Sequence, residues 1–269
     1  MGFDALEILS ADLLKSYKAA VPRGLWKRFS ALRESPLSTR TFSFYTSVSA
    51  IASSRIEGEK MEVDSYLKHR MGRARYLPEL VRKPDDLHAA YGYAQRHPMD
   101  QRNFLRAHEK IAAHLLPPGA RGSLRKTEMV VLEHGTQRIQ YEAAPAERVP
   151  HLFAALWRDV GRLKHMKLGV AEAFYFAAFI HLVLEKIHPF ADGNGRAGRL
   201  LEKWFLAEKL GRKAWYLQSE SHYYRNVGRY YRNLSRPGIF YEDQAYSRAL
   251  PFLLMLPESL KLSRTRQNP

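Results

Sequence analysis

The sequence contains no cysteine among its 269 residues. This absence excludes a disulfide framework and any metal or iron–sulfur site built on cysteine ligands. A secretory leader is not expected, because Asp4 and Glu7 stand where such a leader has basic and then apolar residues. Long apolar runs are missing as well: the most apolar segment, residues 170–187, is interrupted by Glu172 and Glu185. We therefore expect a soluble, cytoplasmic protein without a membrane-spanning helix.

Acidic side chains are scarce relative to basic ones. The chain has 27 Asp and Glu against 43 Lys and Arg, which gives a formal net charge of +16. Such a balance favours anionic partners: nucleotides, nucleic acids or acidic protein surfaces. The basic residues are scattered over several clusters, which is typical of a solvated surface. Tyrosine and arginine alternate over residues 222–232 as they do in single-strand binders, so nucleic-acid binding is kept as the weaker alternative.

Apolar residues at helical spacing predict a mostly helical chain without internal repeats. Proline and glycine mark the predicted helix ends, for instance Pro22 and Gly24 after the first helix. Pro84 is predicted to occupy the first turn of its helix. The predicted helices span residues 6–20, 26–32, 42–57, 64–69, 84–95, 103–115, 146–163, 170–187, 196–210, 221–234 and 244–260.

One segment predicts β structure. Residues 129–132 and 138–141 have the composition of two short strands, with Gly135 in the turn between them. A lone hairpin is only marginally stable in water, so it must rest on the helices. The predicted fold class is therefore all-α, a helical bundle with a small β-hairpin.

The loop between the helices predicted over 170–187 and 196–210 concentrates chemically useful side chains. Pro189 disfavours helical geometry at His188, which places His188 at the mouth of a turn. Gly193 and Gly195 flank Asn194 and permit backbone angles that let successive N–H groups face one point, a nest that binds phosphate. The start of the next helix adds further unpaired N–H groups. These features predict a phosphate cradle.

The charged residues of this loop fit the same interpretation. Asp192 supplies an oxygen ligand suited to Mg²⁺, which usually bridges a carboxylate and phosphates. Arg196 and Arg199 are three residues apart and therefore neighbours on the first turn of the helix. His188, beside the phosphates, is a natural general base for an incoming hydroxyl. The site is not a P-loop, because no G-x-x-x-x-G-K-[ST] sequence occurs.

The stretch from His188 to Arg199 resembles the signature of the Fic (Fido) domain family, H-x-F-x-[D/E]-G-N-G-R-x-x-R, and every fixed position is met. The resemblance extends to residues 178–187 before the signature. Residues 121–125 and the hairpin resemble the family's flap, and residues 141–149 resemble its descent into the next helix. It covers roughly residues 103–234. The resemblance implies a Fic-type bundle with the β-hairpin as a flap over the active site.

Members of this family typically transfer AMP from ATP to the hydroxyl of a Ser, Thr or Tyr side chain of a protein. The resemblance implies His188 as the base, Asp192 as the Mg²⁺ ligand, and a protein target that can include the enzyme itself. It implies nucleotide binding by Gly193, Asn194, Gly195, Arg196 and Arg199. It implies docking of the target by strand addition to the flap residues Thr127, Glu128, Met129, Val130 and Val131.

Two positions depart from the family pattern. The exit of the flap usually carries consecutive prolines, and here it reads Ala143-Ala144-Pro145. Tyr230 and Tyr231 are the candidates for the purine pocket, but Gly238 stands where relatives often have asparagine. The resemblance therefore leaves the base pocket open.

A second pattern lies far upstream. Residues 53–58 fit the family's inhibitory sequence [S/T]-x-x-x-E-[G/N], with Ser53, Glu57 and Gly58 at the fixed positions. Ser53 and Glu57 are four apart and share a helix face. In relatives with this helix, the glutamate pairs with the second arginine of the signature, here Arg199, and occupies the place of the γ-phosphate. The resemblance thus implies autoinhibition.

The sequence predicts three regions: an N-terminal helical region over 1–102 with the inhibitory helix at about 42–58, a Fic core over 103–235 with the flap at about 121–145 and the catalytic loop at 188–199, and a C-terminal helical extension over 236–269. Removal of AMP and another nucleotidyl or phosphoryl transfer are the alternatives on the same site. A nucleic-acid-binding regulator with a vestigial site is the alternative from another class.

His108 and His114 make a poor zinc pair because they lie on different helix faces, and His181 is expected to support the core.

Overall fold

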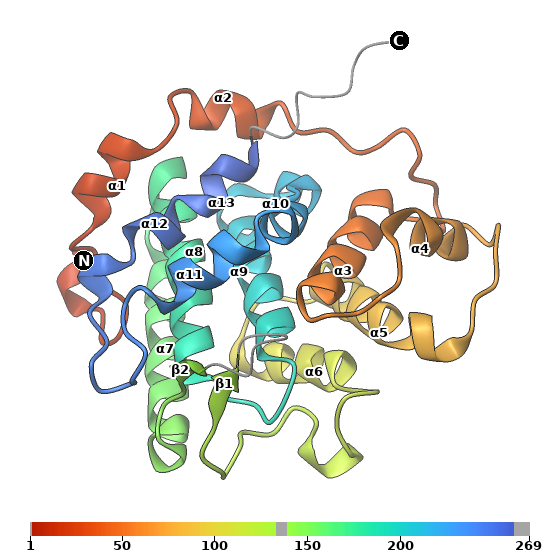
Figure 1. Ribbon diagram of the computed structural model, residues 1–269. Helices are drawn as coiled ribbons and strands as arrows, with labels where there is room; N and C mark the ends of the chain where they lie inside the picture. The colour runs from red at the N-terminus through yellow and green to blue at the C-terminus, as the bar shows by residue number, and fades with distance from the viewer. Residues whose placement is uncertain (1, 133–138, 261–269) are drawn as a thin grey trace.

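The computed structural model describes residues 2–132 and 139–260, which form a helical bundle with a two-stranded sheet at one end (Figure 1). The helices are α1 (Leu14–Ala20), α2 (Leu25–Ser30), α3 (Phe44–Ile56), α4 (Val63–Arg70), α5 (Pro78–Ala94), α6 (Gln101–Ile111), α7 (Val149–His165), α8 (Val170–Ile187), α9 (Asn194–Leu210), α10 (Ser219–Arg225), α11 (Val227–Ser235), α12 (Leu250–Leu253) and α13 (Met255–Glu258). The strands are β1 (Val130–Leu132) and β2 (Ile139–Glu142). The predicted fold class is confirmed.

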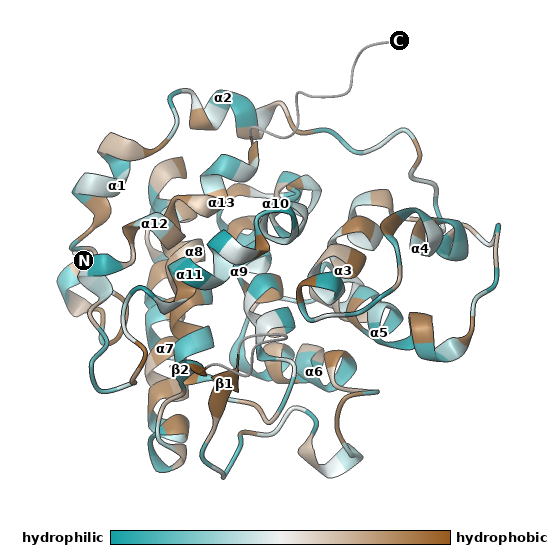
Figure 2. Cartoon of the chain, in the orientation of Figure 1, coloured by the Kyte–Doolittle hydropathy of each residue, from teal (hydrophilic) through white to brown (hydrophobic). Residues whose placement is uncertain are grey.

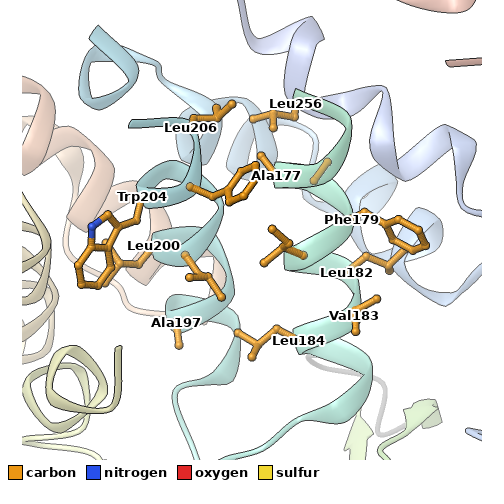
Figure 3. Packing of buried hydrophobic residues seen from close by; sticks show 14 of the residues in the cluster. Ala177, Phe179, Leu182, Val183, Leu184, Ala197, Leu200, Trp204, Leu206 and Leu256 are labelled. Atoms are coloured by element: carbon orange, nitrogen blue, oxygen red, sulfur yellow. The ribbon is translucent and has the colours of Figure 1, made fainter. Parts of the chain in front are cut away.

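Helix α8 is the centre of the bundle. Every residue from Ala173 to Ile187 is buried, and this mostly apolar helix is surrounded by other helices (Figure 2). Leu184 of α8 packs toward Ala197 and Leu200 of α9 (Figure 3). Because α8 and α9 are fixed against each other, the loop that joins them is fixed at both ends. None of the helices in the described ranges is long and apolar enough to cross a membrane.

The two strands pair antiparallel, with Val131 opposite Tyr141. The side chain of Tyr141 is buried, and the Glu142 N–H donates to the Ile239 carbonyl at 2.7 Å. These contacts attach the sheet to the bundle, as a marginal hairpin requires. The expected turn at Gly135 and the expected strand start at Arg138 lie outside the described residues.

The helix predicted over 6–20 is wrong in its first half, because regular helix begins only at Leu14. The reason is Asp159 of α7, whose buried carboxylate accepts the backbone N–H groups of Glu7, Ile8 and Leu9 at 2.8–3.0 Å. A carboxylate that accepts several N–H groups competes with the intrahelical bonds these groups would otherwise make. A distant side chain therefore overrides the local preference.

We expect Asp159→Asn to lower the free energy of unfolding by about 1–3 kcal/mol, because an amide turns one of two acceptors into a donor facing buried N–H groups. Urea denaturation measures this loss. Glu7→Gln is the matched control, since it removes only solvent-exposed ion pairs with Arg158 and Arg162. The control should cost much less than Asp159→Asn, because exposed ion pairs contribute little to stability. Equal losses in the two variants would contradict the role given to Asp159.

Prolines account for two further corrections. Pro84 lies inside α5 and not in its first turn, because Pro78 takes that position six residues earlier. The helix predicted over 244–260 is broken into a short 3₁₀ turn, α12 and α13. Pro251 in α12 and Pro257 in α13 have no N–H to continue the helical hydrogen bonds.

Other helix boundaries differ from the prediction as well: α6 ends at Ile111 and not at residue 115, and α7 begins at Val149 and not at residue 146. The helix predicted over 221–234 is divided at Asn226 into α10 and α11. Helix α9 begins at Asn194, two residues before the predicted start.

Candidate active site

The loop between α8 and α9 begins at His188, which has a positive φ of 50°. This left-handed conformation ends α8, and the His188 N–H still donates to the Leu184 carbonyl at 2.8 Å. Gly193 closes the loop with φ 85°, and a Cβ there would come within 3.2–3.4 Å of His108, Ile111 and Leu115. Glycine is therefore required at position 193 both by conformation and by space.

His188 is largely buried, and its Nδ1 atom faces the interior. Nδ1 lies 3.2 Å from the Tyr141 hydroxyl and 3.3 Å from the Glu185 carbonyl oxygen. Burial lowers the pKa of His188 to about 4. The imidazole is therefore neutral near pH 7, which is the state that accepts a proton. Its other nitrogen, Nε2, has no hydrogen-bond partner among the described residues.

Asn194 and His108 brace the loop from inside. The Asn194 side-chain amide accepts from the Phe190 N–H at 2.9 Å and donates to the Phe190 carbonyl at 2.8 Å. His108 stacks on the Phe190 ring with centroids 3.6 Å apart, and its Nε2 lies 2.9 Å from the Asp192 carbonyl oxygen. The Gly122 N–H donates to its Nδ1 at 3.0 Å. Asn194 therefore shapes the loop with both ends of its amide, and His108 is a loop support.

Arg125 connects the flap segment to the loop. Its buried guanidinium donates to the backbone carbonyls of His188, Thr127, Ile187 and Ala144, with distances of 2.7, 2.6 and 3.2 Å to the first three. In addition, the Arg125 N–H donates to the Pro189 carbonyl at 2.8 Å. One side chain thus fixes the flap base to the end of α8. Sequence reasoning missed this role because all the partners are backbone atoms.

The first turn of α9 forms an anion cradle. Arg196 and Arg199 both have buried side chains, 4% and 1% exposed. Gly195 lies between them and the segment after α3, since a Cβ at Gly195 would collide with the Glu57 carboxylate and come within 3.2 Å of the Arg199 guanidinium. Unpaired N–H groups, the helix dipole and two guanidinium groups together favour a polyphosphate here.

Asp192 is exposed at the rim of the cradle. One of its carboxylate oxygens accepts from the Gly193 N–H at 2.6 Å. In the described parts of the chain, no group of three His, Cys, Asp or Glu side chains is placed to hold a metal ion. A single carboxylate nevertheless fits Mg²⁺, which keeps several waters and takes its remaining ligands from substrate phosphates.

Helix α3 brings Ser53 and Glu57 to Arg199. The Glu57 carboxylate accepts from the Arg199 guanidinium at 2.5 Å, and the buried Ser53 hydroxyl accepts from Arg199 Nε at 2.8 Å. Burial alone would raise the pKa of Glu57, but Arg199 and Arg196 outweigh it, and the pKa is lowered. Gly58 follows with φ 86° and ends the helix. The contact implied by the family resemblance is therefore present in the fold.

A second carboxylate lies beside the first arginine of the cradle. Glu59 accepts from Arg196 at 3.3 Å and from Lys83 of α5 at 2.8 Å. Both arginines of the cradle thus face a carboxylate from the segment after α3. No sequence signal pointed to Glu59, because its partner Arg196 lies 137 residues away and belongs to another element.

The other expected site residues are placed less directly. Tyr230 is buried, and its hydroxyl lies 3.2 Å from the Arg199 guanidinium and 3.1 Å from His181 Nε2. The Tyr231 hydroxyl donates to the Ile56 carbonyl at 3.1 Å. Tyr231 therefore contacts the end of α3 and Tyr230 contacts Arg199, so both hydroxyls are already engaged within the protein. His181 lies in the core, as expected, with Nδ1 at 2.8 Å from Glu202.

The flap residues lie at the edge of the sheet. Thr127, Glu128 and Val130 are exposed, whereas Met129 and Val131 are partly buried. The Met129 carbonyl accepts from the Ala143 N–H at 3.1 Å. Within the described residues, β1 pairs on one side only, with β2. Its outer edge therefore has the geometry for an added strand.

Residues 98–206 match the model of the Fic/DOC family. Among solved structures, the chain is similar to a Fic family protein from Desulfovibrio desulfuricans G20, with a TM-score of 0.73 and 23% identity over 96% of this chain and 75% of that chain. It is also similar to a Fic domain containing signaling protein from Bacteroides thetaiotaomicron VPI-5482, with a TM-score of 0.65 and 19% identity over 93% of this chain and 94% of that chain. Fic-1 from C. elegans matches with a TM-score of 0.63 and 17% identity over 93% of this chain and 69% of that chain. No curated protein matches significantly.

Proposed function

Since residues 98–206 form a Fic/DOC family domain, we propose that this protein transfers AMP from ATP to the hydroxyl of a Ser, Thr or Tyr side chain of a target protein, and that α3 inhibits the transfer. Members of this family commonly move a nucleoside monophosphate to proteins. The observation that carries the proposal is the position of the neutral, buried His188 beside a cradle with two arginines.

In the proposed reaction, His188 accepts the proton of the acceptor hydroxyl at Nε2. The hydroxyl oxygen attacks the α-phosphorus of ATP, the bond from that phosphorus to the oxygen bridging to the β-phosphate breaks, and pyrophosphate leaves. Arg196 and the N–H groups of the first turn of α9 balance the charge on the phosphates. No covalent intermediate on the protein is needed, because the loop holds the two reactants together.

Asp192 would hold Mg²⁺ at the rim of the cradle. When bound, the ion supplies charge neutralisation to the phosphates and fixes their orientation. The Gly193 N–H that donates to the Asp192 carboxylate keeps this side chain directed along the loop.

The proposed inhibition depends on competition for Arg199. Glu57 already satisfies this guanidinium, and its carboxylate lies directly over Gly195. A terminal phosphate of ATP would need the same guanidinium and would be repelled by the charged carboxylate. ATP would then bind with its α-phosphorus displaced from the attacking hydroxyl. Glu59 adds to this effect by occupying Arg196.

The decisive experiment supplies ATP with the label on either the α- or the γ-phosphate and follows label on the protein itself. We expect α-label and no γ-label on the protein, in the presence of Mg²⁺ and with Glu57→Gly as the enzyme. Transfer of γ-label alone would establish a kinase-type reaction and overturn the proposal. Loss of α-label from a premodified protein, faster with wild type than with Glu57→Gly, would support AMP removal instead.

A further inference from the structure

A buried carboxylate lies behind the candidate base. Glu185 is 3% exposed and projects from α8 one turn before His188. Its Oε2 atom is 4.0 Å from His188 Nδ1, which is too far for a hydrogen bond. The Tyr141 hydroxyl of β2 fills the gap: it donates to Glu185 Oε2 at 3.0 Å and lies 3.2 Å from His188 Nδ1. A Tyr hydroxyl therefore bridges the carboxylate and the imidazole.

This arrangement selects one tautomer of His188. A hydroxyl has one hydrogen, and the charged Glu185 takes it, so the Tyr141 oxygen is left as an acceptor toward Nδ1. The second neighbour of Nδ1, the Glu185 carbonyl oxygen at 3.3 Å, can only accept. Both contacts therefore require a hydrogen on Nδ1. The lone pair is then on Nε2, where the proposed reaction needs it.

The charge state of Glu185 controls this selection. Burial raises its pKa. The groups that face it are His181 at 3.8 Å, Tyr141 and His188, and the charges of Arg199 and Glu57 also act on it. A protonated Glu185 would donate to the Tyr141 oxygen, the hydroxyl hydrogen would turn to Nδ1, and the hydrogen of His188 would move to Nε2. His188 would then have no lone pair on Nε2, the atom that faces the acceptor hydroxyl in the proposed reaction.

We propose that Glu185 and Tyr141 are positioning residues that hold His188 as the Nδ1–H tautomer and stabilise the imidazolium formed when it accepts a proton. The inference rests on the proposed function, because it assigns a role within the same site.

The chain offers a matched control a short distance away. Tyr223 of α10 donates to Glu202 of α9 at 2.7 Å, and both side chains are fully buried. This second Tyr–Glu pair has the same chemistry, but it contacts His181 and not His188. Loss of a buried hydroxyl at Tyr223 therefore tests the structural cost without touching the candidate base.

The kinetic test uses the Glu57→Gly enzyme as the parent and compares Glu185→Gln, Tyr141→Phe and Tyr223→Phe by α-label transfer. For the first two we expect kcat to fall about tenfold or more, with KM for ATP within about twofold. The acid limb of the pH–rate profile should move to lower pH in Glu185→Gln, because this variant removes the titrating carboxylate and its negative charge. Tyr223→Phe should leave the position of the limb unchanged. The proposal is overturned if Glu185→Gln and Tyr141→Phe leave both kcat and the pH of the acid limb unchanged. It is also overturned if Tyr223→Phe shifts the acid limb by the same amount.

The second test needs no activity. In ¹⁵N-histidine-labelled protein, the His188 signals are assigned by their absence in His188→Ala, and the tautomer is read at neutral pH. We expect mainly Nδ1–H in wild type and a larger Nε2–H fraction in Glu185→Gln and Tyr141→Phe. An unchanged tautomer in both variants would overturn the inference. If the Glu57→Gly parent transfers no label, the proposed function fails, and this measurement still decides the role of Glu185.

Discussion

Glu57→Gly is expected to increase self-labelling from α-labelled ATP by about tenfold to a hundredfold. The physical reason is that Arg199, now paired with Glu57 at 2.5 Å, becomes available to a phosphate of ATP. A coupling of this size between an inhibitory contact and a ligand corresponds to about 1–3 kcal/mol. The initial rate of label incorporation at saturating ATP and Mg²⁺ measures the effect.

The control for this variant is Glu62→Gln. Glu62 lies five residues further along the same segment, but it pairs with Arg55 and not with an arginine of the cradle. It should leave the rate within about twofold of wild type, as expected for an exposed pair of little energetic weight. A rise in both variants would mean that loosening of the segment, and not release of Arg199, activates the enzyme. No rise in Glu57→Gly would contradict the proposed brake.

Glu57→Gly should also change how stability depends on ATP. Without the Glu57 carboxylate, the buried Arg199 keeps only neutral side chains as hydrogen-bond partners among the described residues, namely Ser53 and Tyr230. An unpaired buried charge destabilises the fold, and a ligand that pairs with it restores stability. We therefore expect a lower Tm than wild type in the absence of nucleotide and a larger rise in Tm when ATP is added.

His188→Ala, introduced into the Glu57→Gly enzyme, is expected to reduce label transfer by a factor of about 10² or more. The acceptor hydroxyl then loses the base that takes its proton, whereas the cradle for the phosphates is unchanged. Because the pKa of His188 is lowered to about 4, the loss should be seen throughout the neutral pH range. Single-turnover label transfer measures the rate, and calorimetry measures ATP binding.

The matched control is His114→Ala, which removes a half-exposed histidine that pairs with Asp86 and not with a residue of the loop. The His114→Ala variant should transfer label at the same rate as its Glu57→Gly parent. ATP affinity should be retained in His188→Ala within about threefold, since removing an interaction made only in the transition state lowers kcat without weakening binding. Label transfer that persists in His188→Ala would show that His188 is not the general base.

The differences between the predicted and the observed fold lie at helix boundaries. Helix boundaries were wrong where a distant side chain or a proline decided them, as at Asp159, which holds residues 7–9, and at Pro78, which starts α5. Helices with a continuous apolar pattern were predicted well, and α8 begins and ends at the predicted residues. Apolar periodicity is a property of the local sequence, whereas a competing acceptor from another helix is not.

The sequence by itself determined the loop from His188 to Arg199, because its proline, glycines and charged residues act through positions a few residues apart. It also determined the helical fold class, since the 3.6-residue period is local. Only the tertiary structure decided what surrounds that loop: Glu59 at Arg196, Arg125 on four carbonyls, and Tyr141 between Glu185 and His188. These partners come from the segment after α3, the flap segment, β2 and α8. Their meeting depends on how the helices pack, which spacing along the chain does not encode.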